Sequence, residues 1–155
     1  MFLGTHQNRL DAKGRVSIPA PFRSVLRQGQ GQGQGPGAAS LVLRPSHNYA
    51  CVEGWPEAEF AALAAPLARL DLFSKEHDAL ATALYADAYP VEADREGRIV
   101  LPDRLRLHAN LEEAVVFMGL GRTFQIWEPA AAERWRAELR QRANAAGMTL
   151  PAAAG

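Results

Sequence analysis

The pattern of apolar and polar positions along the chain predicts short strands and short helices in a regular order. Short apolar runs at 40–44, 48–53, 114–119 and 122–127 predict strands. Two further short strands are predicted where Arg15-Val16-Ser17-Ile18 and Arg98-Ile99-Val100-Leu101 run into a proline. Residues 20–27 and 103–109 are each predicted to form a single short helix. This mixture of elements predicts the α+β fold class.

Three longer helices are also predicted. The first spans residues 56–72, and Pro66 inside it predicts a kink or a break. The second begins at Ser74 as the N-cap and continues to about residue 86. The third runs from Pro129 to about residue 143, and the tail from residue 147 is predicted to fray. Phe60, Leu63, Leu67 and Leu70 are expected on one face of the first helix. Leu80 and Leu84 are expected to be buried on the second, and Trp135 and Leu139 are expected to point inward on the third.

The chain contains an internal repeat. Residues 11–23 align with residues 94–106 at a constant offset of 83, and five of the thirteen positions are identical. The similarity continues through the following strands and the proline that precedes each long helical segment. The offset there falls to about 75, because a Gly/Gln-rich insert occupies residues 28–37. This low-complexity insert is predicted to be a mobile loop.

Each copy of the repeat begins with an Asp-x-x-Gly-Arg segment. Asp11 and Asp94 are expected to form a tight turn or to orient the following arginine, and Gly14 and Gly97 are expected to be turn-forming. One copy alone is too small for a stable core, so the two halves are expected to pair around a pseudo-twofold axis and close one small barrel. The expected division is a first repeat at 5–54, a helical connector at 55–87, a second repeat at 88–131 and a C-terminal helix with a frayed tail at 132–155.

The formal net charge of zero hides an asymmetry along the chain. Residues 1–52 carry six basic side chains and one acidic one, and residues 53–133 carry seven basic and fifteen acidic ones. Residues 134–155 are again basic. Electrostatic fields act over about 8 Å at physiological salt, so a neutral protein can still present a basic face to a polyanion. The neutral total excludes only a DNA coat driven by bulk charge.

Composition excludes several classes of protein. Apolar residues make up 48% of the chain, so it is not wholly disordered. No apolar run reaches the roughly 18 residues of a membrane span, and the N-terminal residues lack the features of a signal peptide, which predicts a cytoplasmic protein with no membrane partner. A lone cysteine, Cys51, excludes an internal disulfide and is expected to be a small buried hydrophobe. No catalytic constellation, metal site or cofactor site is predicted, because the four histidines have no partners at ligand spacing.

The motifs resemble those of one family. Met1-Phe2-x-Gly4, Asp11-x-Lys13-Gly14-Arg15-Val16-Ser17-Ile18-Pro19 and Asp94-x-x-Gly97-Arg98-Ile99-x-Leu101-Pro102 are similar to the motifs of the MraZ family of bacterial transcriptional regulators. The resemblance extends from residue 1 to about residue 143, and the insert at 28–37 departs from the family pattern.

The resemblance implies a fold, an assembly and a function. The fold would be two tandem AbrB/SpoVT-like half-domains that form one small swapped-hairpin-like β-barrel with flanking helices. The assembly would be a ring-shaped homo-oligomer. The function would be sequence-specific binding to double-stranded DNA at short, G-containing direct repeats upstream of the protein's own division and cell-wall operon, usually as a repressor. Such a protein would be cytoplasmic and associated with the nucleoid.

Arg15 and Arg98 are the leading candidate DNA contacts. Arginine can form a bidentate pair with O6 and N7 of guanine in the major groove. Alternatively, each arginine pairs with the aspartate of its own turn and only locks it, and the two roles can coexist. Lys13 corresponds to Glu96 in the second copy, so the first half is expected to attract phosphate more strongly. The full candidate DNA-binding set is Arg15, Arg98, Lys13, Asp11, Asp94, Arg9, Arg23 and Arg106.

Other interpretations of these residues stay open at this stage. Arg9, Arg23 and Arg106 could be phosphate contacts, solvated surface or parts of ion pairs between subunits. The whole chain could be an AbrB-like protein-interaction or antitoxin-type module. An antitoxin of this class usually has one half-domain and a disordered tail, whereas this chain has two similar halves and three long helical segments. No residues in the sequence support an enzymatic function.

Overall fold

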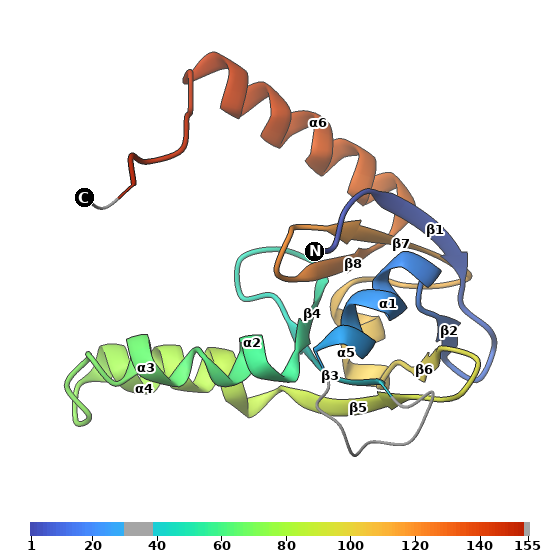
Figure 1. Ribbon diagram of the computed structural model, residues 1–155, viewed down its shortest axis with the longest axis horizontal. Helices are drawn as coiled ribbons and strands as arrows, with labels where there is room; N and C mark the ends of the chain where they lie inside the picture. Colours follow the sequence, from blue (N-terminus) through green and yellow to red (C-terminus); the bar gives the residue numbers. More distant parts are fainter. Residues whose placement is uncertain (30–38, 154–155) are drawn as a thin grey trace.

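The computed structural model describes residues 1–29 and 39–153. Figure 1 shows a body built of strands and short helices, from which longer helical segments project. The chain begins with β1 (Thr5–Arg9), β2 (Arg15–Ser17), α1 (Ala20–Gln28), β3 (Ala39–Pro45) and β4 (Val52–Pro56). The same order of elements recurs in β5 (Tyr89–Ala93), β6 (Arg98–Val100), α5 (Asp103–His108), β7 (Ala114–Gly119) and β8 (Phe124–Trp127). Between the two sets lie α2 (Glu57–Ala61), α3 (Ala64–Leu67), α4 (Lys75–Ala81) and the π-helix η1 (Thr82–Ala86), and α6 (Pro129–Ala145) follows the second set.

The strands form an open six-stranded antiparallel sheet and a separate two-stranded ribbon. The sheet order is β1-β7-β8-β4-β3-β5, and the ribbon consists of β2 and β6. Each strand of the first set therefore pairs with a strand of the second set. When β1, β3 and β4 are exchanged with their counterparts β5, β7 and β8, the strand order is the same read from the opposite edge. The assignment of the two sets to AbrB/SpoVT-like half-domains stays a prediction.

The expected closed barrel is wrong for the described part of the chain. Strands β1 and β5 form the two edges of the sheet and do not pair with each other. The strands that could have joined them, β2 and β6, are three residues long and pair only with one another. The mixed α+β class is confirmed, with an antiparallel sheet in place of a barrel.

The core lies between the sheet, the ribbon and the helices α1 and α5. Aromatic rings form its centre, with the ring of Phe2 5.1 Å from those of Phe22 and Phe124. Leu105 of α5 is fully buried in the same cluster, as are Val16 and Ile99 from the ribbon. The ribbon and both helices are therefore fixed to the sheet by apolar contacts, which account for most of the stabilisation of a domain of this size.

The two short helices agree closely with those predicted from the sequence, whereas one predicted strand does not. Helices at 20–27 and 103–109 were predicted, and α1 and α5 begin at these positions. The strand predicted at 48–53 instead begins at Val52. The reason is that the Ser46 hydroxyl accepts hydrogen bonds from the backbone N–H groups of Asn48 and Tyr49, at 3.2 and 3.1 Å, and folds this segment into a turn. The insert predicted as a loop at 28–37 lies, from residue 30 onward, outside the described residues.

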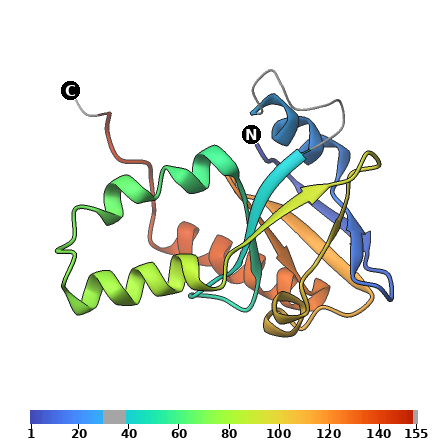
Figure 2. The same cartoon turned by 90° about the horizontal axis from the view of Figure 1, so that it is seen from below.

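The helical connector is an antiparallel hairpin that projects from the sheet, as Figures 1 and 2 both show. The break expected near Pro66 is present, because α2 ends at Ala61 and α3 begins at Ala64. Ser74 caps α4, as predicted, by accepting a hydrogen bond from the backbone N–H of His77 at 3.0 Å. The burial predicted for Leu80 and Leu84 is wrong, because no helix of this hairpin contains a buried residue in the single chain. The side chains that are only half-buried are Phe60, Leu63, Leu67, Leu70, Leu80 and Leu84.

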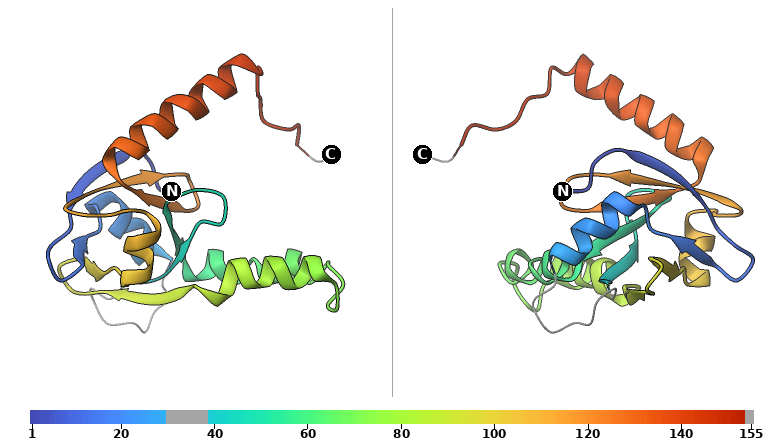
Figure 3. Two further views of the ribbon diagram at one scale, coloured as in Figure 1. Left: turned by 180° about the vertical axis from the view of Figure 1, so that it is seen from behind. Right: turned by 45° about the vertical axis from the view of Figure 1, so that its right-hand side comes forward.

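The C-terminal helix α6 touches the body only near its start. Trp135 packs against Tyr49 and Trp127, with ring centroids 4.8 and 6.1 Å apart. Beyond that point the helix runs away from the sheet, as both views of Figure 3 show. Leu139, expected to be buried, is 37% exposed because no element of the described chain faces it. No helix among the described residues is long and apolar enough to cross a membrane.

Candidate nucleic-acid interface

Two turns of matching geometry join the strands that flank them. In the first turn, residues 11–15, Asp11 Oδ1 accepts hydrogen bonds from the backbone N–H groups of Lys13 and Arg15, both at 2.9 Å. Gly14 follows with a φ of +80°, a left-handed conformation that glycine adopts without steric cost. The Gly14 N–H donates to the Asp11 carbonyl oxygen at 3.0 Å. This arrangement reverses the chain within five residues.

The second turn, residues 94–98, repeats this geometry. Asp94 Oδ1 accepts from the backbone N–H groups of Glu96 and Arg98, both at 2.9 Å. Gly97 has a φ of +78°, and its N–H donates to the Asp94 carbonyl oxygen at 3.0 Å. The backbones of the two turns are therefore held by the same set of hydrogen bonds.

Each turn also orients an arginine. Arg15 Nε donates to Asp11 Oδ2 at 2.8 Å, and Arg98 Nε donates to Asp94 Oδ2 at 3.1 Å. Both arginine side chains are 40% exposed. The pKa of each aspartate is lowered, chiefly by the hydrogen bond from the backbone N–H of its arginine. Both carboxylates are therefore ionised near neutral pH, and each fixes the plane of one guanidinium group.

The ribbon presents the two arginines on one face. In its register Arg15 lies opposite Val100, and Ser17 lies opposite Arg98. Because directly opposed residues and residues two apart point to the same side, these four side chains share one face. The alternate residues, Val16 and Ile99, point into the core and are each 1% exposed. Arg15 and Arg98 are diagonal neighbours on this outward face, at opposite ends of the three-residue ribbon.

The two turns are supported by the opposite half of the chain. The Ile18 N–H donates to the Gly97 carbonyl oxygen, and the Leu101 N–H donates to that of Gly14, both at 2.8 Å. Arg23, from the end of the first copy, donates through Nη1 to the Glu96 carbonyl oxygen at 3.0 Å. Arg106, its counterpart, lies beside Gly14. Each turn therefore depends on residues that follow the other turn in the sequence.

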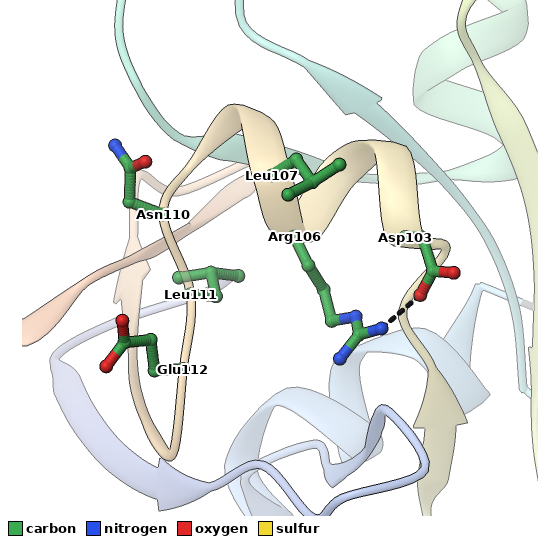
Figure 4. A pocket seen from close by; sticks show the side chains of 6 residues that line it. All are labelled: Asp103, Arg106, Leu107, Asn110, Leu111 and Glu112. Atoms are coloured by element: carbon green, nitrogen blue, oxygen red, sulfur yellow. Dashed lines mark hydrogen bonds and ion pairs between the residues drawn. The ribbon is translucent and has the colours of Figure 1, made fainter.

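Arg106 also lines a shallow pocket of about 440 Å³ beside α5. Figure 4 shows its guanidinium group turned toward Asp103, with which it forms an ion pair. A neighbouring hollow continues from this pocket to Arg9 and Asp11 at the first turn. The Nε atoms of Arg23 and Arg106 are buried and have no hydrogen-bond partner within the described residues. Both side chains thus lie against the protein rather than extending into solvent.

The remaining candidate residues are on the surface near the first turn. Lys13 is exposed at the tip of that turn, and Arg9 is exposed at the end of β1. At the position equivalent to Lys13, Glu96 forms an ion pair with Arg98, at 2.9 Å between Oε2 and Nη2. The structure thus brings Arg15, Arg98, Lys13 and Arg9 to the region of the two turns, whereas Arg23 and Arg106 lie behind the turns.

Sequence reasoning missed the pairing of Glu96 with Arg98 and the crossed support by Arg23. A signal for the pairing exists in the alternation of Asp94, Glu96 and Arg98, which places two carboxylates within reach of one guanidinium. The identity of Arg23 and Arg106 in the repeat was a signal for a shared structural role. Within the described residues, no cluster of three or more His, Cys, Asp or Glu could hold a metal ion.

Comparison with known proteins identifies relatives over nearly the whole chain. The family model described as "MraZ protein, putative antitoxin-like" matches residues 1–82 and 84–150. A transcriptional regulator MraZ from Gluconacetobacter diazotrophicus is 66% identical over 152 residues, covering 98% of this chain and 92% of the relative. The protein of the same name from Gluconobacter oxydans is 57% identical over 151 residues, covering 97% and 87%. That from Azorhizobium caulinodans is 40% identical over 138 residues, covering 89% and 82%.

Proposed function

The chain belongs to the MraZ family of transcriptional regulators, and from this premise we propose that it binds double-stranded DNA sequence-specifically through its two turns and the β2–β6 ribbon. The single observation that carries the proposal is the outward face of the ribbon. It carries Arg15 and Arg98 as diagonal neighbours, and an ionised aspartate orients the guanidinium group of each. The major groove of B-form DNA admits a two-stranded ribbon of this kind.

The residues near the ribbon divide into three roles. Arg15 and Arg98 contact base edges, where a bidentate pair with guanine contributes about 1–3 kcal/mol of discrimination. Lys13 and Arg9 contact phosphates, which position the protein without reading sequence. Asp11 and Asp94 orient the two arginines. We assign Arg23 and Arg106 to supporting the turns, because Arg23 donates to the Glu96 carbonyl oxygen and Arg106, paired with Asp103, lies beside Gly14.

A single protomer is too small to recognise an operator selectively. Two short turns offer few base contacts, so selectivity requires several protomers on one DNA molecule. We propose a ring-shaped homo-oligomer that binds short direct repeats upstream of its own division and cell-wall operon and represses it. The half-buried leucines of the 57–86 hairpin and Phe73, 90% exposed near its tip, support self-association, because apolar surface of this kind is usually covered by a partner. This function places the protein in the cytoplasm, at the nucleoid.

We also propose that the chain is divided into repeats at 5–54 and 88–131, with the connector at 55–87 and the C-terminal segment at 132–155. The palindromic strand order of the sheet supports this division, because corresponding strands occupy equivalent places.

A binding titration on the protein's own upstream DNA tests the proposal. The wild-type chain should bind this fragment more tightly than a scrambled fragment, and the affinity should fall steeply with salt. Arg15→Ala with Arg98→Ala should abolish the preference. The matched control is Arg136→Ala with Arg140→Ala, which removes two exposed arginines from α6 and should retain it.

Two results would overturn the proposal. If the double variant of Arg15 and Arg98 binds as the wild type does, the site is wrong. If the wild-type chain does not distinguish its upstream DNA from the scrambled fragment, the regulator does not act through sequence-specific contacts, and a protein-interaction or antitoxin-type role becomes the better explanation.

A further inference from the structure

We propose that Glu96 weakens the contact of Arg98 with DNA, so that the two turns of one protomer are unequal and the first turn contributes more to binding than the second. This inference rests on the proposed function, because it concerns how the same site is tuned. It names a residue, Glu96, that sets the affinity of the second turn without being a DNA contact.

The two guanidinium groups differ in how many carboxylates engage them. Arg15 is bonded through Nε to Asp11 alone, and its two terminal nitrogens have no hydrogen bond or ion pair with the described part of the chain. Arg98 is bonded through Nε to Asp94 and through Nη2 to Glu96 Oε2, at 3.1 and 2.9 Å. Carboxylates therefore engage two of the five N–H groups of Arg98 but only one of the five of Arg15.

This difference affects base recognition directly. A bidentate contact with guanine needs two N–H groups of one guanidinium directed at O6 and N7. Arg15 has both terminal nitrogens available while Asp11 fixes its orientation. Arg98 keeps a free N–H on each terminal nitrogen, but a second carboxylate offsets its charge, and the Glu96 carboxylate beside it repels the DNA backbone.

Glu96 is also held in place for this role. Its backbone N–H donates to Asp94 Oδ1 at 2.9 Å, and its carbonyl oxygen accepts from Arg23 Nη1 at 3.0 Å. The side chain itself is 70% exposed, and an exposed ion pair of this kind is weak. The attenuation of Arg98 is therefore graded, and a single substitution at position 96 can relieve it.

The two turns match closely enough for this difference to be isolated. Their Asp-to-backbone hydrogen bonds are equal in length, and both arginine side chains are 40% exposed. Between aspartate and glycine lie Ala12 and Lys13 in the first turn, and the exposed Arg95 and Glu96 in the second. Exchanging Lys13 and Glu96 leaves Ala12 and Arg95 in place and alters neither the composition nor the net charge of the chain.

Single substitutions in the full-length protein give the first test, read as the dissociation constant for the upstream DNA. Arg15→Ala should weaken binding about tenfold or more, the loss of one good bidentate contact. Arg98→Ala should weaken it by a clearly smaller factor. Glu96→Gln should tighten binding more than Glu92→Gln, a control that removes one exposed negative charge from β5 near the same turn.

The exchange variant, Lys13→Glu with Glu96→Lys, gives the decisive test. In this background Arg98→Ala should become the more harmful substitution and Arg15→Ala the milder one. Circular dichroism and thermal unfolding of each variant verify that the fold is retained.

The inference is overturned if Arg98→Ala is as harmful as Arg15→Ala in the wild-type chain, or if the order does not reverse in the exchange variant. These failures differ from failure of the proposed function. If the proposed function itself is wrong, substitution of Arg15 or Arg98, singly or together, leaves DNA binding unchanged.

Discussion

Arg23 of α1 lies across Gly97 of the second turn. Its Nη1 donates to the neighbouring Glu96 carbonyl oxygen at 3.0 Å, and its side chain fills the space in which a Cβ on Gly97 would stand. The equivalent space beside Gly14 is more open, because a Cβ there would lie 3.6 Å from Arg106 Nε and 3.3 Å from the Leu101 carbonyl oxygen. The turns match in backbone shape but differ in how tightly the opposite half encloses them.

Alanine at the two glycines should therefore have unequal effects. Both positions have positive φ, which costs an alanine about 1–2 kcal/mol. Gly97→Ala should lower the free energy of unfolding by more than Gly14→Ala, because its methyl group also displaces Arg23 and breaks the bond to Glu96. Urea unfolding of the two variants measures the difference.

A double-mutant cycle separates the displaced side chain from the backbone strain. In an Arg23→Ala background, Gly97→Ala should cost no more than Gly14→Ala costs in the wild-type chain. An equal cost of Gly97→Ala with and without Arg23 would show that the arginine does not support the second turn.

A buried arginine anchors the helical hairpin to the sheet. Arg44, 1% exposed, donates to Glu53 Oε1 at 2.5 Å, to His47 Nδ1 at 3.0 Å and to the Ala83 carbonyl oxygen in η1 at 2.8 Å. Arg44→Met should lower the free energy of unfolding by about 3 kcal/mol or more, because it leaves the carboxylate of Glu53 without its positively charged partner and with only the hydrogen bond from Trp55 Nε1. Chemical denaturation measures this loss, and amide exchange at residues 82–86 should accelerate.

The control for this substitution removes both charges. Arg44→Met with Glu53→Gln should recover part of the lost stability, because no charge is then left unpaired. If the double variant is less stable than Arg44→Met alone, the stranded carboxylate is not the source of the loss.

Cys51 should be inert toward thiol reagents in the folded protein. Its side chain is fully buried, and burial, with a smaller contribution from the charge of Glu53, raises the pKa of the thiol to about 12. At pH 8 almost no reactive thiolate is therefore present. Labelling with a chromogenic disulfide should be slow in buffer and fast in denaturing urea. Moving the thiol to the exposed neighbouring position, with Cys51→Ala and Ala50→Cys, should make labelling fast in buffer, and equal rates for the two proteins would contradict this prediction.

The local elements were predictable where a local cause produces them. Pro19 and Pro102 precede the two short helices, and α1 and α5 begin directly after them. The serine at position 74 caps α4 from the position expected of it. The strand order and the open sheet were not predictable, because periodicity identifies strands and leaves their long-range partners undetermined. The contact of the Ala83 carbonyl oxygen in η1 with Arg44, thirty-nine residues earlier, was not predictable for the same reason.

Only the residues of the candidate site that recur in the internal repeat were predictable from the sequence. The alignment of two Asp-x-x-Gly-Arg segments identified both arginines and both aspartates. The support of one half by the other could not be deduced, because Arg23 and Glu96 are seventy-three residues apart and meet only in the folded chain. Amphipathic spacing also misled the prediction for Leu139, since a helix with an apolar stripe is buried only where the chain supplies a surface opposite it.

Acid should weaken the two turns together. The folded-state pKa values of Asp11 and Asp94 are lowered by hydrogen bonds from backbone N–H groups. Their contribution to stability is therefore fully present above the ordinary aspartate pKa of about 3.9 and is lost as the pH falls through the lower folded-state values. Asp11→Asn with Asp94→Asn should reduce this acid-dependent loss, measured by urea unfolding between about pH 7 and pH 3.

The same variant separates the shape of the turns from the orientation of the arginines. Asparagine retains the Oδ1 acceptor for the backbone N–H groups, so the turns should persist at neutral pH, whereas the ion pairs with Arg15 and Arg98 are lost. DNA affinity should therefore fall although the fold is retained. Glu57→Gln with Glu76→Gln, which removes two exposed charges from the helical hairpin, serves as the control and should leave the acid-dependent loss as large as in the wild type. An unchanged acid profile in the aspartate variant would show that the two carboxylates do not stabilise the folded turns.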